Sequence, residues 1–170
     1  LLFLLYVATM SIPWQVYMLP QYSLMNTFGL VDTHLGYILM QSFNAFGVFL
    51  MRQAFISIPD ELLEAARIDG LSEYGIYAKI MLPLSKASIT TLVIFTFVTI
   101  WNDYMGPMIY FNTETNKTIQ LGIRMFIGQY STEYGLVMAV SVLALLPVLI
   151  IFLIGQKQFV QGVASSGIKG

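Results

Sequence analysis

The sequence predicts an all-α membrane protein, a polytopic helical bundle interrupted by one polar helix–turn–helix segment. Of its 170 residues, 57% are hydrophobic and only 10% are charged, whereas an average soluble domain carries about 25% charged residues. Its long apolar stretches approach the roughly 20 residues that a helix needs to cross a bilayer. A polar segment over residues 58–83 separates them. These three observations favour a single membrane domain over residues 1–170.

Composition also excludes several classes of function. The net charge of −1 provides no basic surface for nucleic acid. The absence of cysteine and the presence of a single histidine, His34, argue against disulfides and against a metal site. We find no Ser/His/Asp constellation and no glycine loop of the phosphate-binding type, so we expect no catalytic residues, no cofactor and no ATP site. Because the chain begins with Leu, we expect it to be the C-terminal part of a longer protein.

Four membrane spans are predicted, over residues of about 1–25, 37–55, 86–105 and 135–155. Pro13 should kink or interrupt the first of them, because proline removes a backbone hydrogen bond. The β-branched residues of the third span do not argue against a helix, since a backbone in lipid must satisfy its own hydrogen bonds. Pro147 in the last span can be accommodated by neighbouring helices.

A few polar side chains lie in or next to these spans and are candidate residues of a transport path: Gln15, Asn44, Asn102 and Asp103. Gln15 equally suits a hydrogen bond between packed helices. An ionisable residue beside a span, such as Asp103, is a functional candidate. A solvated helix end near Gly106 explains Asp103 equally well.

Basic residues predict the orientation, because Lys and Arg are enriched on the cytoplasmic side. Loops over residues 29–36 and 111–134 should be external, the second with a re-entrant or surface-lying helix over 119–130. Six basic residues lie on one predicted side (Arg52, Arg67, Lys79, Lys86, Lys157 and Lys169) and two on the other (Lys117 and Arg124). The segment over residues 58–83 and the C-terminus are therefore predicted to be cytoplasmic.

The segment over residues 58–83 reads as helix, glycine turn, helix. Pro59 suits the first helical position, and Asp60 and Glu61 follow where the helix dipole favours negative charge. Gly70 can adopt the left-handed conformation that ends a helix, and Ser72 can cap the next helix, which runs toward residue 83.

One face of the first helix of this segment is predicted to be smooth. Leu62, Ala65, Ala66 and Asp69 follow the i, i+3, i+4, i+7 spacing that places residues on one side of a helix. A face with so little side-chain bulk suits close docking into the groove of a partner.

The segment resembles the EAA loop of permease subunits of ATP-binding-cassette importers. The matching residues, at the family's spacing, are Glu64, Ala65, Ala66, Gly70, Ile80, Leu82 and Pro83. The longer string EAARIDG is similar to the carbohydrate branch, the maltose-type and glycerol-phosphate-type permeases. The Pro-x-Gln at residue 13, the WND at residue 101 and the C-terminal pattern from Phe159 to Gly170 also resemble that branch, although Ser166 replaces a common glycine.

The resemblance implies a multi-pass permease in the cytoplasmic membrane of a bacterial or archaeal cell. It would carry a di- or oligosaccharide or glycerol phosphate. Its partners would be membrane lipid, a second permease subunit, two cytoplasmic ATPase subunits and an external solute-binding protein. The coupling residues would be Glu64, Ala65, Ala66, Asp69, Gly70 and Leu71. Among them Glu64 would contact the ATPase, the two alanines would allow close packing, Gly70 would form the turn and Asp69 would bond within the loop.

Two alternatives of other classes remain at this point. An ion-coupled secondary transporter could use Asp103 as its titrating group, but it leaves the EAA spacing unexplained. A membrane scaffold without a transport path is the other alternative, and the polar residues Gln15, Asn44 and Asn102 argue against it.

Overall fold

The computed structural model describes residues 2–128 and 132–167, and for residues 158–167 it describes the backbone alone. Within these ranges every regular element is a helix, apart from one isolated antiparallel bridge between Ile127 and Thr132. The predicted all-α class is therefore confirmed. The chain forms two compact units, one made of residues 1–44 and 97–151 and the other of residues 45–96 and 152–170.

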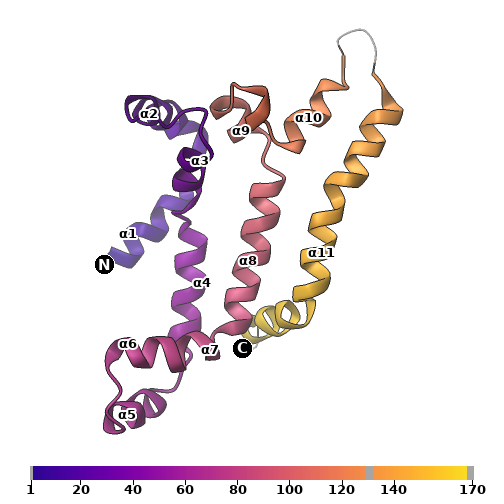
Figure 1. Ribbon diagram of the computed structural model, residues 1–170. Helices are drawn as coiled ribbons and strands as arrows, with labels where there is room; N and C mark the ends of the chain where they lie inside the picture. Colours follow the sequence, from indigo (N-terminus) through magenta and orange to yellow (C-terminus); the bar gives the residue numbers. More distant parts are fainter. Residues whose placement is uncertain (1, 129–131, 168–170) are drawn as a thin grey trace. The chain divides into compact units, whose positions relative to one another are not determined.

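The first unit contains helices from both halves of the sequence (Figure 1). They are α1 Leu2–Ala8, the 3-10 helix η1 Thr9–Ser11, α2 Trp14–Thr27, α3 His34–Gln41, α9 Met105–Tyr110, the 3-10 helix η3 Glu114–Asn116, α10 Ile119–Met125 and the greater part of α11 Tyr134–Gly167. The helix expected over residues 119–130 is thus shorter than predicted, and part of that range lies outside the described residues.

The predicted first span over residues 1–25 is not one straight helix. Its two halves, Leu2–Ser11 and Trp14–Thr27, meet at an angle of 104°. Pro13 lies at the break with ψ 138°, which is extended rather than helical. Since proline has no N–H to donate to the preceding turn, a helix that reaches it from the N-terminal side ends there. The predicted interruption at Pro13 is confirmed, and its angle is larger than a kink.

An aromatic core holds the first unit together. Met25, Tyr37, Tyr110 and Phe111 are buried against one another, and the Tyr37 and Phe111 ring centroids are 5.2 Å apart. These residues come from the consecutive helices α2 and α3 and from the end of α9, which lies far from them in the sequence. Buried aromatic side chains remove large apolar areas from water, so this cluster fixes α2 and α3 relative to α9.

Asp32 joins the two loops of the first unit. Its carboxylate accepts hydrogen bonds from the backbone N–H of Asn112 at 3.0 Å and of Thr113 at 3.2 Å, and also from the Thr113 hydroxyl. The Asn116 amide donates to the Asp32 backbone oxygen at 2.8 Å. The Asn116 amide also donates to the carboxylate oxygen Oδ1 at 3.1 Å. The hydrogen bonds that the carboxylate accepts from Thr113 and Asn116 lower the Asp32 pKa to about 2. Asp32 has φ +60°, a conformation that Asp tolerates better than most residues.

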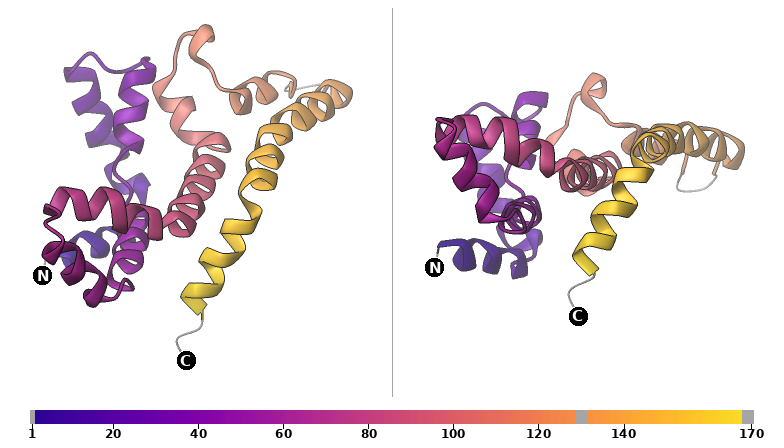
Figure 2. Two further views of the ribbon diagram at one scale, coloured as in Figure 1. Left: turned by 60° about the horizontal axis from the view of Figure 1, so that its bottom comes forward. Right: turned by 90° about the horizontal axis from the view of Figure 1, so that it is seen from below.

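The second unit is continuous in sequence apart from its C-terminal segment. Its helices are α4 Ala45–Ile56, α5 Asp60–Ile68, α6 Glu73–Ile76, the π-helix η2 Tyr77–Met81, α7 Leu82–Leu84 and most of α8 Lys86–Trp101. We refer to residues 58–83 as the hairpin. Two further views show α5 and α6 folded back on each other through the turn around Gly70 (Figure 2).

The second arm of the hairpin contains a π-helix just before Pro83. The Leu82 N–H donates to the Tyr77 carbonyl, five residues earlier. In an α-helix, the ring of Pro83 would clash with the Lys79 carbonyl, and that carbonyl would lack its N–H donor. The wider π-turn is a local adjustment of the helix at this point. The chain then bends by 72° between Glu73–Leu84 and Lys86–Trp101.

Membrane-spanning character is clearest at the C-terminal end. The part of α11 from Tyr134 to Lys157 is long and apolar enough to cross a bilayer, and it continues through Pro147. Two further candidates arise if each bent helix pair is one span. The predicted span over 37–55 is divided, because α3 ends at Gln41 and the apolar α4 begins at Ala45.

Candidate functional site

The turn of the hairpin is a complete helix C-cap. The Leu71 N–H donates to the Ala66 carbonyl and the Gly70 N–H donates to the Arg67 carbonyl, each at 3.0 Å. This pair of bonds is the Schellman motif, which needs a residue in the left-handed region after the helix. Gly70 has φ +80°, as expected from its position in the motif. Among the described residues, a Cβ at Gly70 would meet no atom within 4 Å, so the constraint comes from φ and not from space.

The second arm of the hairpin begins with two further local contacts. The Ser72 hydroxyl accepts the Gly75 N–H at 3.2 Å, which confirms Ser72 as the N-cap of α6. Across the turn, the Arg67 guanidinium donates to Glu73 with Nε–Oε1 2.8 Å and Nη2–Oε2 3.4 Å. This contact lowers the pKa of Glu73 and raises that of Arg67. Since both side chains are exposed, the ion pair orients the arms without adding much stability.

The two alanines of the EAA sequence lie in different environments. Ala66 is only 4% exposed, and it is buried in the hairpin, as is Ile76 at 2%. Ala65 is exposed. The prediction that both alanines belong to one exposed docking face is therefore wrong for Ala66. The i, i+3, i+4 rule grouped them correctly on one side of α5, but Ala66 is far enough around the helix to face α6.

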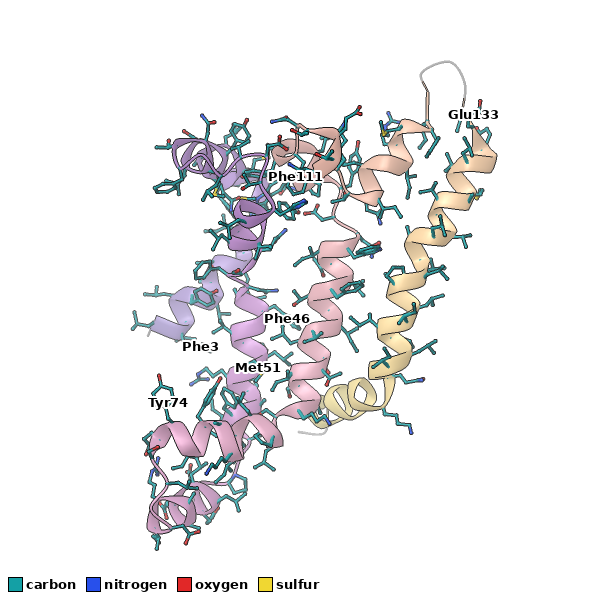
Figure 3. All side chains as sticks on the ribbon, in the orientation of Figure 1. Phe3, Phe46, Met51, Tyr74, Phe111 and Glu133 are labelled. Carbon is teal, nitrogen blue, oxygen red and sulfur yellow. The ribbon has the colours of Figure 1, made fainter. Side chains whose placement is uncertain are left out.

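The exposed apolar surface of the hairpin comes instead from residues that the sequence analysis did not select. Ile68 is 86% exposed and Tyr74 is 88% exposed. Figure 3 shows Tyr74 projecting from α6 on the side away from α5. Ile68 follows Glu64 and Ala65 by four and three residues, so the three share a face of α5. This spacing could have identified Ile68 from the sequence.

The remaining predicted coupling residues surround that surface. Glu64 and Asp69 are exposed and Leu71 is half-buried, with its side chain 3.2 Å from the position of a Cβ at Gly75. Asp69 caps α5 through its backbone, whose N–H donates to the Ala65 carbonyl at 2.9 Å. Within the described part of the chain the Asp69 side chain makes no hydrogen bond. The hairpin thus presents Ile68 and Tyr74 among acidic side chains.

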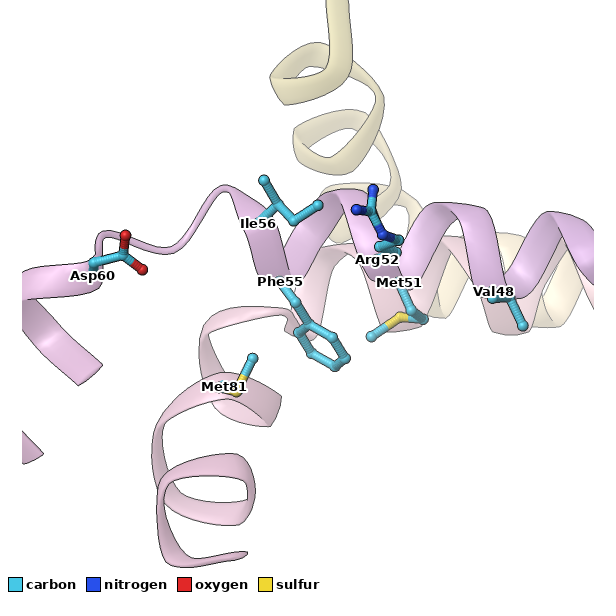
Figure 4. A pocket seen from close by; sticks show the side chains of 7 residues that line it. All are labelled: Val48, Met51, Arg52, Phe55, Ile56, Asp60 and Met81. Carbon is cyan, nitrogen blue, oxygen red and sulfur yellow. The ribbon is translucent and has the colours of Figure 1, made fainter. Parts of the chain in front are cut away.

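An open, mostly apolar hollow of about 560 Å³ lies beside α4 at the start of the hairpin. Figure 4 shows Met51 and Phe55 of α4 on the side that faces Met81, with Asp60 at one end of the hollow. Phe55 also contacts Tyr77 edge-on, with ring centroids 6.0 Å apart. These contacts connect α4 to the second arm of the hairpin.

Asp103 is the predicted path residue with the most contacts. Its carboxylate accepts hydrogen bonds from the Tyr37 hydroxyl, from the Gly106 N–H at 3.1 Å and from the Gln41 amide at 3.5 Å. A Cβ at Gly106 would lie 2.6 Å from both Asp103 Oδ2 and the Tyr37 hydroxyl, so the glycine makes room for this cluster. Asp103 is half-buried. Asp103 therefore makes specific contacts at the start of α9, and its part in a transport path stays a prediction.

The other three predicted path residues do not join Asp103. Gln15 is exposed on α2 and has no hydrogen-bond partner among the described residues. Asn102 is exposed, donates to the Val98 carbonyl at 2.9 Å and accepts from Gln120 at 3.3 Å. Asn44 is exposed in the link that follows α3. That the four residues line one path stays a prediction.

Asp103 instead lines a cavity of about 370 Å³ within the first unit. Other lining residues that the sequence analysis did not select are Trp14, Tyr17, Gln21, Tyr37 and Gln41. The indole Nε1 of Trp14 donates to Gln21 Oε1 at 3.0 Å. Tyr17 and Gln21 follow Trp14 by three and seven residues, which is the spacing of one face of a helix. This spacing could have identified these lining residues of α2 from the sequence.

Comparison with known proteins identifies the family. Residues 1–165 match the family described as binding-protein-dependent transport system inner membrane component. The chain is 35% identical over 170 residues to the arabinooligosaccharides transport system permease protein AraQ of Bacillus subtilis (strain 168), covering 100% of this chain and 60% of that protein. It is 37% identical to the lactose transport system permease protein LacG of Rhizobium radiobacter, covering 93% and 58%.

Two further similarities point the same way. The sn-glycerol-3-phosphate transport system permease protein UgpE of Brucella abortus (strain 2308) is 34% identical, with 93% of this chain and 57% of that protein covered. A chain in the crystal structure of a bacterial ABC transporter involved in the import of the acidic polysaccharide alginate matches with a TM-score of 0.79 and 26% identity, covering 93% and 61%.

The chain therefore spans about 60% of the length of the relatives that it matches. The relatives are named as permease proteins of transport systems, which agrees with the permease resemblance and lends no support to the ion-coupled alternative. The match over residues 1–165 includes both the hairpin and the Asp103 cluster. The protein belongs to the binding-protein-dependent transport system inner membrane component family, the permease subunits of ATP-binding-cassette importers.

Proposed function

We propose that the protein is the permease subunit of an ATP-driven importer of a sugar or of glycerol phosphate, and that the hairpin couples it to a cytoplasmic ATPase. The proposed coupling role rests on one observation. Ile68 and Tyr74 are exposed on the hairpin, whereas Ala66 and Ile76 are buried in it. Covering so exposed an apolar side chain is favourable, so each of these two exposed residues is a place where a partner can gain binding free energy. A short helix with such a face can dock into the groove of a partner.

The acidic side chains of α5, which carries Ile68, define the chemistry of the partner. Asp60, Glu61, Glu64 and Asp69 are exposed on α5 or at its end. A complementary groove would present basic side chains around an apolar floor, since complementary charge sets the orientation of docking. Glu64, one turn before Ile68, is the acidic residue best placed to act at the centre of that contact.

The importer would comprise this permease, a second permease subunit, two ATPase subunits and a solute-binding protein. Its energy would come from the ATPase subunits, because the sequence has no phosphate-binding glycine loop. Closure of the ATPase pair would move the hairpin as a rigid body, and the helices attached to it would follow. The Schellman turn and the Arg67–Glu73 contact support this role by joining α5 firmly to α6.

The proposal includes the orientation in the membrane. The hairpin, with Arg67 and Lys79, would be cytoplasmic, and the loop containing Lys117 would be external. Single cysteines at residues 79 and 117 would report the side directly in this cysteine-free chain. An impermeant thiol reagent added to intact cells should label residue 117 alone. Labelling of residue 79 from outside would reverse the orientation.

The coupling role is tested by adding bulk to the exposed surface of the hairpin. Ala65→Trp should abolish copurification of the ATPase with the full-length permease, because an indole on the docking face prevents close approach. Ala8→Trp is the matched control, since Ala8 is also exposed but lies on α1, outside the hairpin. Both variants should insert into the membrane at parental levels. If Ala65→Trp binds the ATPase and supports ATP-driven uptake as the parent does, the hairpin is not the coupling element.

A further inference from the structure

The cavity of the first unit has the size and the walls of a small-molecule site. Its volume of about 370 Å³ lies within the range of roughly 300–1,000 Å³ that is usual for such sites. One wall is a face of α2 that carries Trp14, Tyr17 and Gln21, spaced i, i+3 and i+7. Another is a face of α3 that carries Tyr37 and Gln41. Aromatic rings and amides therefore share the same space.

The two glutamine side chains that line this cavity each have an amide atom that is not used in a hydrogen bond among the described residues. Gln21 uses its Oε1 to accept from Trp14, and Gln41 uses its Nε2 to donate to Tyr37 at 3.1 Å. Among the described residues, no partner is recorded for Gln21 Nε2 or for Gln41 Oε1. The cavity thus offers one donor and one acceptor on opposite helices.

A third polar group at the cavity is buried and unpaired. Tyr110 lines the cavity and is 2% exposed, and its hydroxyl has no hydrogen-bond partner in the described part of the chain. Buried hydroxyls without a partner are uncommon, because leaving one unpaired is costly. Because this oxygen is closed off from the cavity surface, it adds a polar group to the wall without being a ligand contact.

The charge of the side chains that line the cavity favours a neutral ligand over an anionic one. Asp103 contributes a carboxylate, and the described residues that line the cavity include no Lys, Arg or His. A phosphate or carboxylate ligand would meet a like charge without a basic group to pair with, which is unfavourable in a partly dry site. A neutral polyhydroxylated ligand meets no such penalty. Its C–H faces can pack on aromatic rings while its hydroxyl groups bond to amides.

We propose that this cavity is a binding subsite for a neutral saccharide, with Tyr17 and Trp14 contacting the sugar ring and Gln21 and Gln41 bonding to its hydroxyl groups. The inference rests on the proposed function and narrows it, because it excludes glycerol phosphate as the occupant of this subsite. Asp103 acts here as a positioning residue, since its bonds to Tyr37 and Gln41 hold the α3 wall in place.

The test measures sugar binding to the purified complex of the full-length permease with its partner subunits. Saturation-transfer difference NMR detects weak binding, and lactose, maltose, raffinose and arabinotriose are offered one at a time, with glycerol 3-phosphate as the anionic comparator. At least one neutral sugar should give ring-proton signals. Tyr17→Ala and Gln21→Leu should each reduce these signals at least fivefold. Leu19→Ala is the matched control on α2, because Leu19 is exposed and does not line the cavity.

The outcomes separate this inference from the proposed function. ATPase copurification is recorded on the same preparations for the parent and all three variants, and basal ATP hydrolysis should be equal in the parent and the Leu19→Ala control. Binding of glycerol 3-phosphate but of no neutral sugar would overturn the inference, as would equal sugar signals in all variants or no sugar signal in an ATPase-bound parent. A parent that fails to associate with any ATPase would overturn the proposed function itself.

Discussion

The hairpin and the Asp103 cluster are built in opposite ways. The hydrogen bonds that shape the hairpin turn in the described residues join residues within six positions of each other, such as the Arg67–Glu73 pair. The Asp103 cluster depends on partners 62 and 66 positions away, Gln41 and Tyr37. A local element keeps its shape when the rest of the protein moves, whereas a long-range cluster holds distant segments together. The first suits a coupling element and the second suits the wall of a binding site.

The largest effect is expected at the Asp103 cluster, whose contacts join residues far apart in the sequence. Asp103→Leu removes the acceptor of the Tyr37 hydroxyl and of the Gly106 N–H. Each buried group left unpaired costs about 1–3 kcal/mol, so the thermal unfolding midpoint of the purified complex should fall by several degrees. Asp103→Asn keeps one acceptor oxygen, so its unfolding midpoint should lie between those of Asp103→Leu and the parent. Asp69→Leu, an exposed acid at the hairpin, is the control and should leave the midpoint unchanged. Equal midpoints for Asp103→Leu and the control would show that the cluster does not hold the unit together.

The next largest effect is expected at the turn of the hairpin, whose contacts are local in the sequence. Gly70→Val places a β-branched residue at φ +80°, at a cost of about 1–3 kcal/mol that changes the angle between α5 and α6. Stimulation of ATP hydrolysis by loaded binding protein in proteoliposomes should fall sharply, while membrane insertion should not change. Gly70→Asn is the matched variant, since Asn adopts this conformation far more readily. If the Val and Asn variants couple equally well, the turn geometry does not matter for coupling.

A smaller effect is expected at the Asp32 junction. The pKa of Asp32 is lowered to about 2 from its ordinary value of 3.8, because Thr113 and Asn116 donate hydrogen bonds to the charged form. The stabilisation is therefore complete above pH 4 and is lost as the pH falls toward 2. Hydrogen-exchange protection of the Asn112 and Thr113 amides, corrected for intrinsic rates, should decline over that range. In Asp32→Asn the decline should be absent, and a decline of equal size would assign it to another group.

The smallest effect is expected at the exposed ion pair of the hairpin. Glu73→Gln removes the charge that pairs with Arg67 but keeps an oxygen that can accept a hydrogen bond. Its unfolding midpoint should lie just below that of the parent at low salt. The two should converge at high salt, because exposed pairs are screened. A large difference that persists at high salt would mean that the pair is part of the hairpin core.

The sequence predicted the hairpin well for the same reason that makes it local. Pro59, Gly70 and Ser72 act on their own neighbours, so their residue types and spacing determine the caps. The inward position of Ala66 was missed, because α5 was analysed without the α6 it packs against. The Asp103 cluster was found only in part. Nothing near Asp103 in the sequence points to Tyr37 or Gln41, and tertiary packing alone brings them together.

The π-turn before Pro83 has a consequence for rotation as well as for length. A π-turn holds one residue more than the α-turn that it replaces, and one residue corresponds to about 100° of helical rotation. The five residues of η2 therefore set the direction in which α5 and α6 point around the axis of their own arm. Inserting one alanine after Ala78 would preserve every hydrogen bond in the turn around Gly70 and still aim Ile68 and Tyr74 elsewhere. The number of residues between Gly70 and Pro83 thus fixes the rotational orientation of the hairpin about the axis of its second arm.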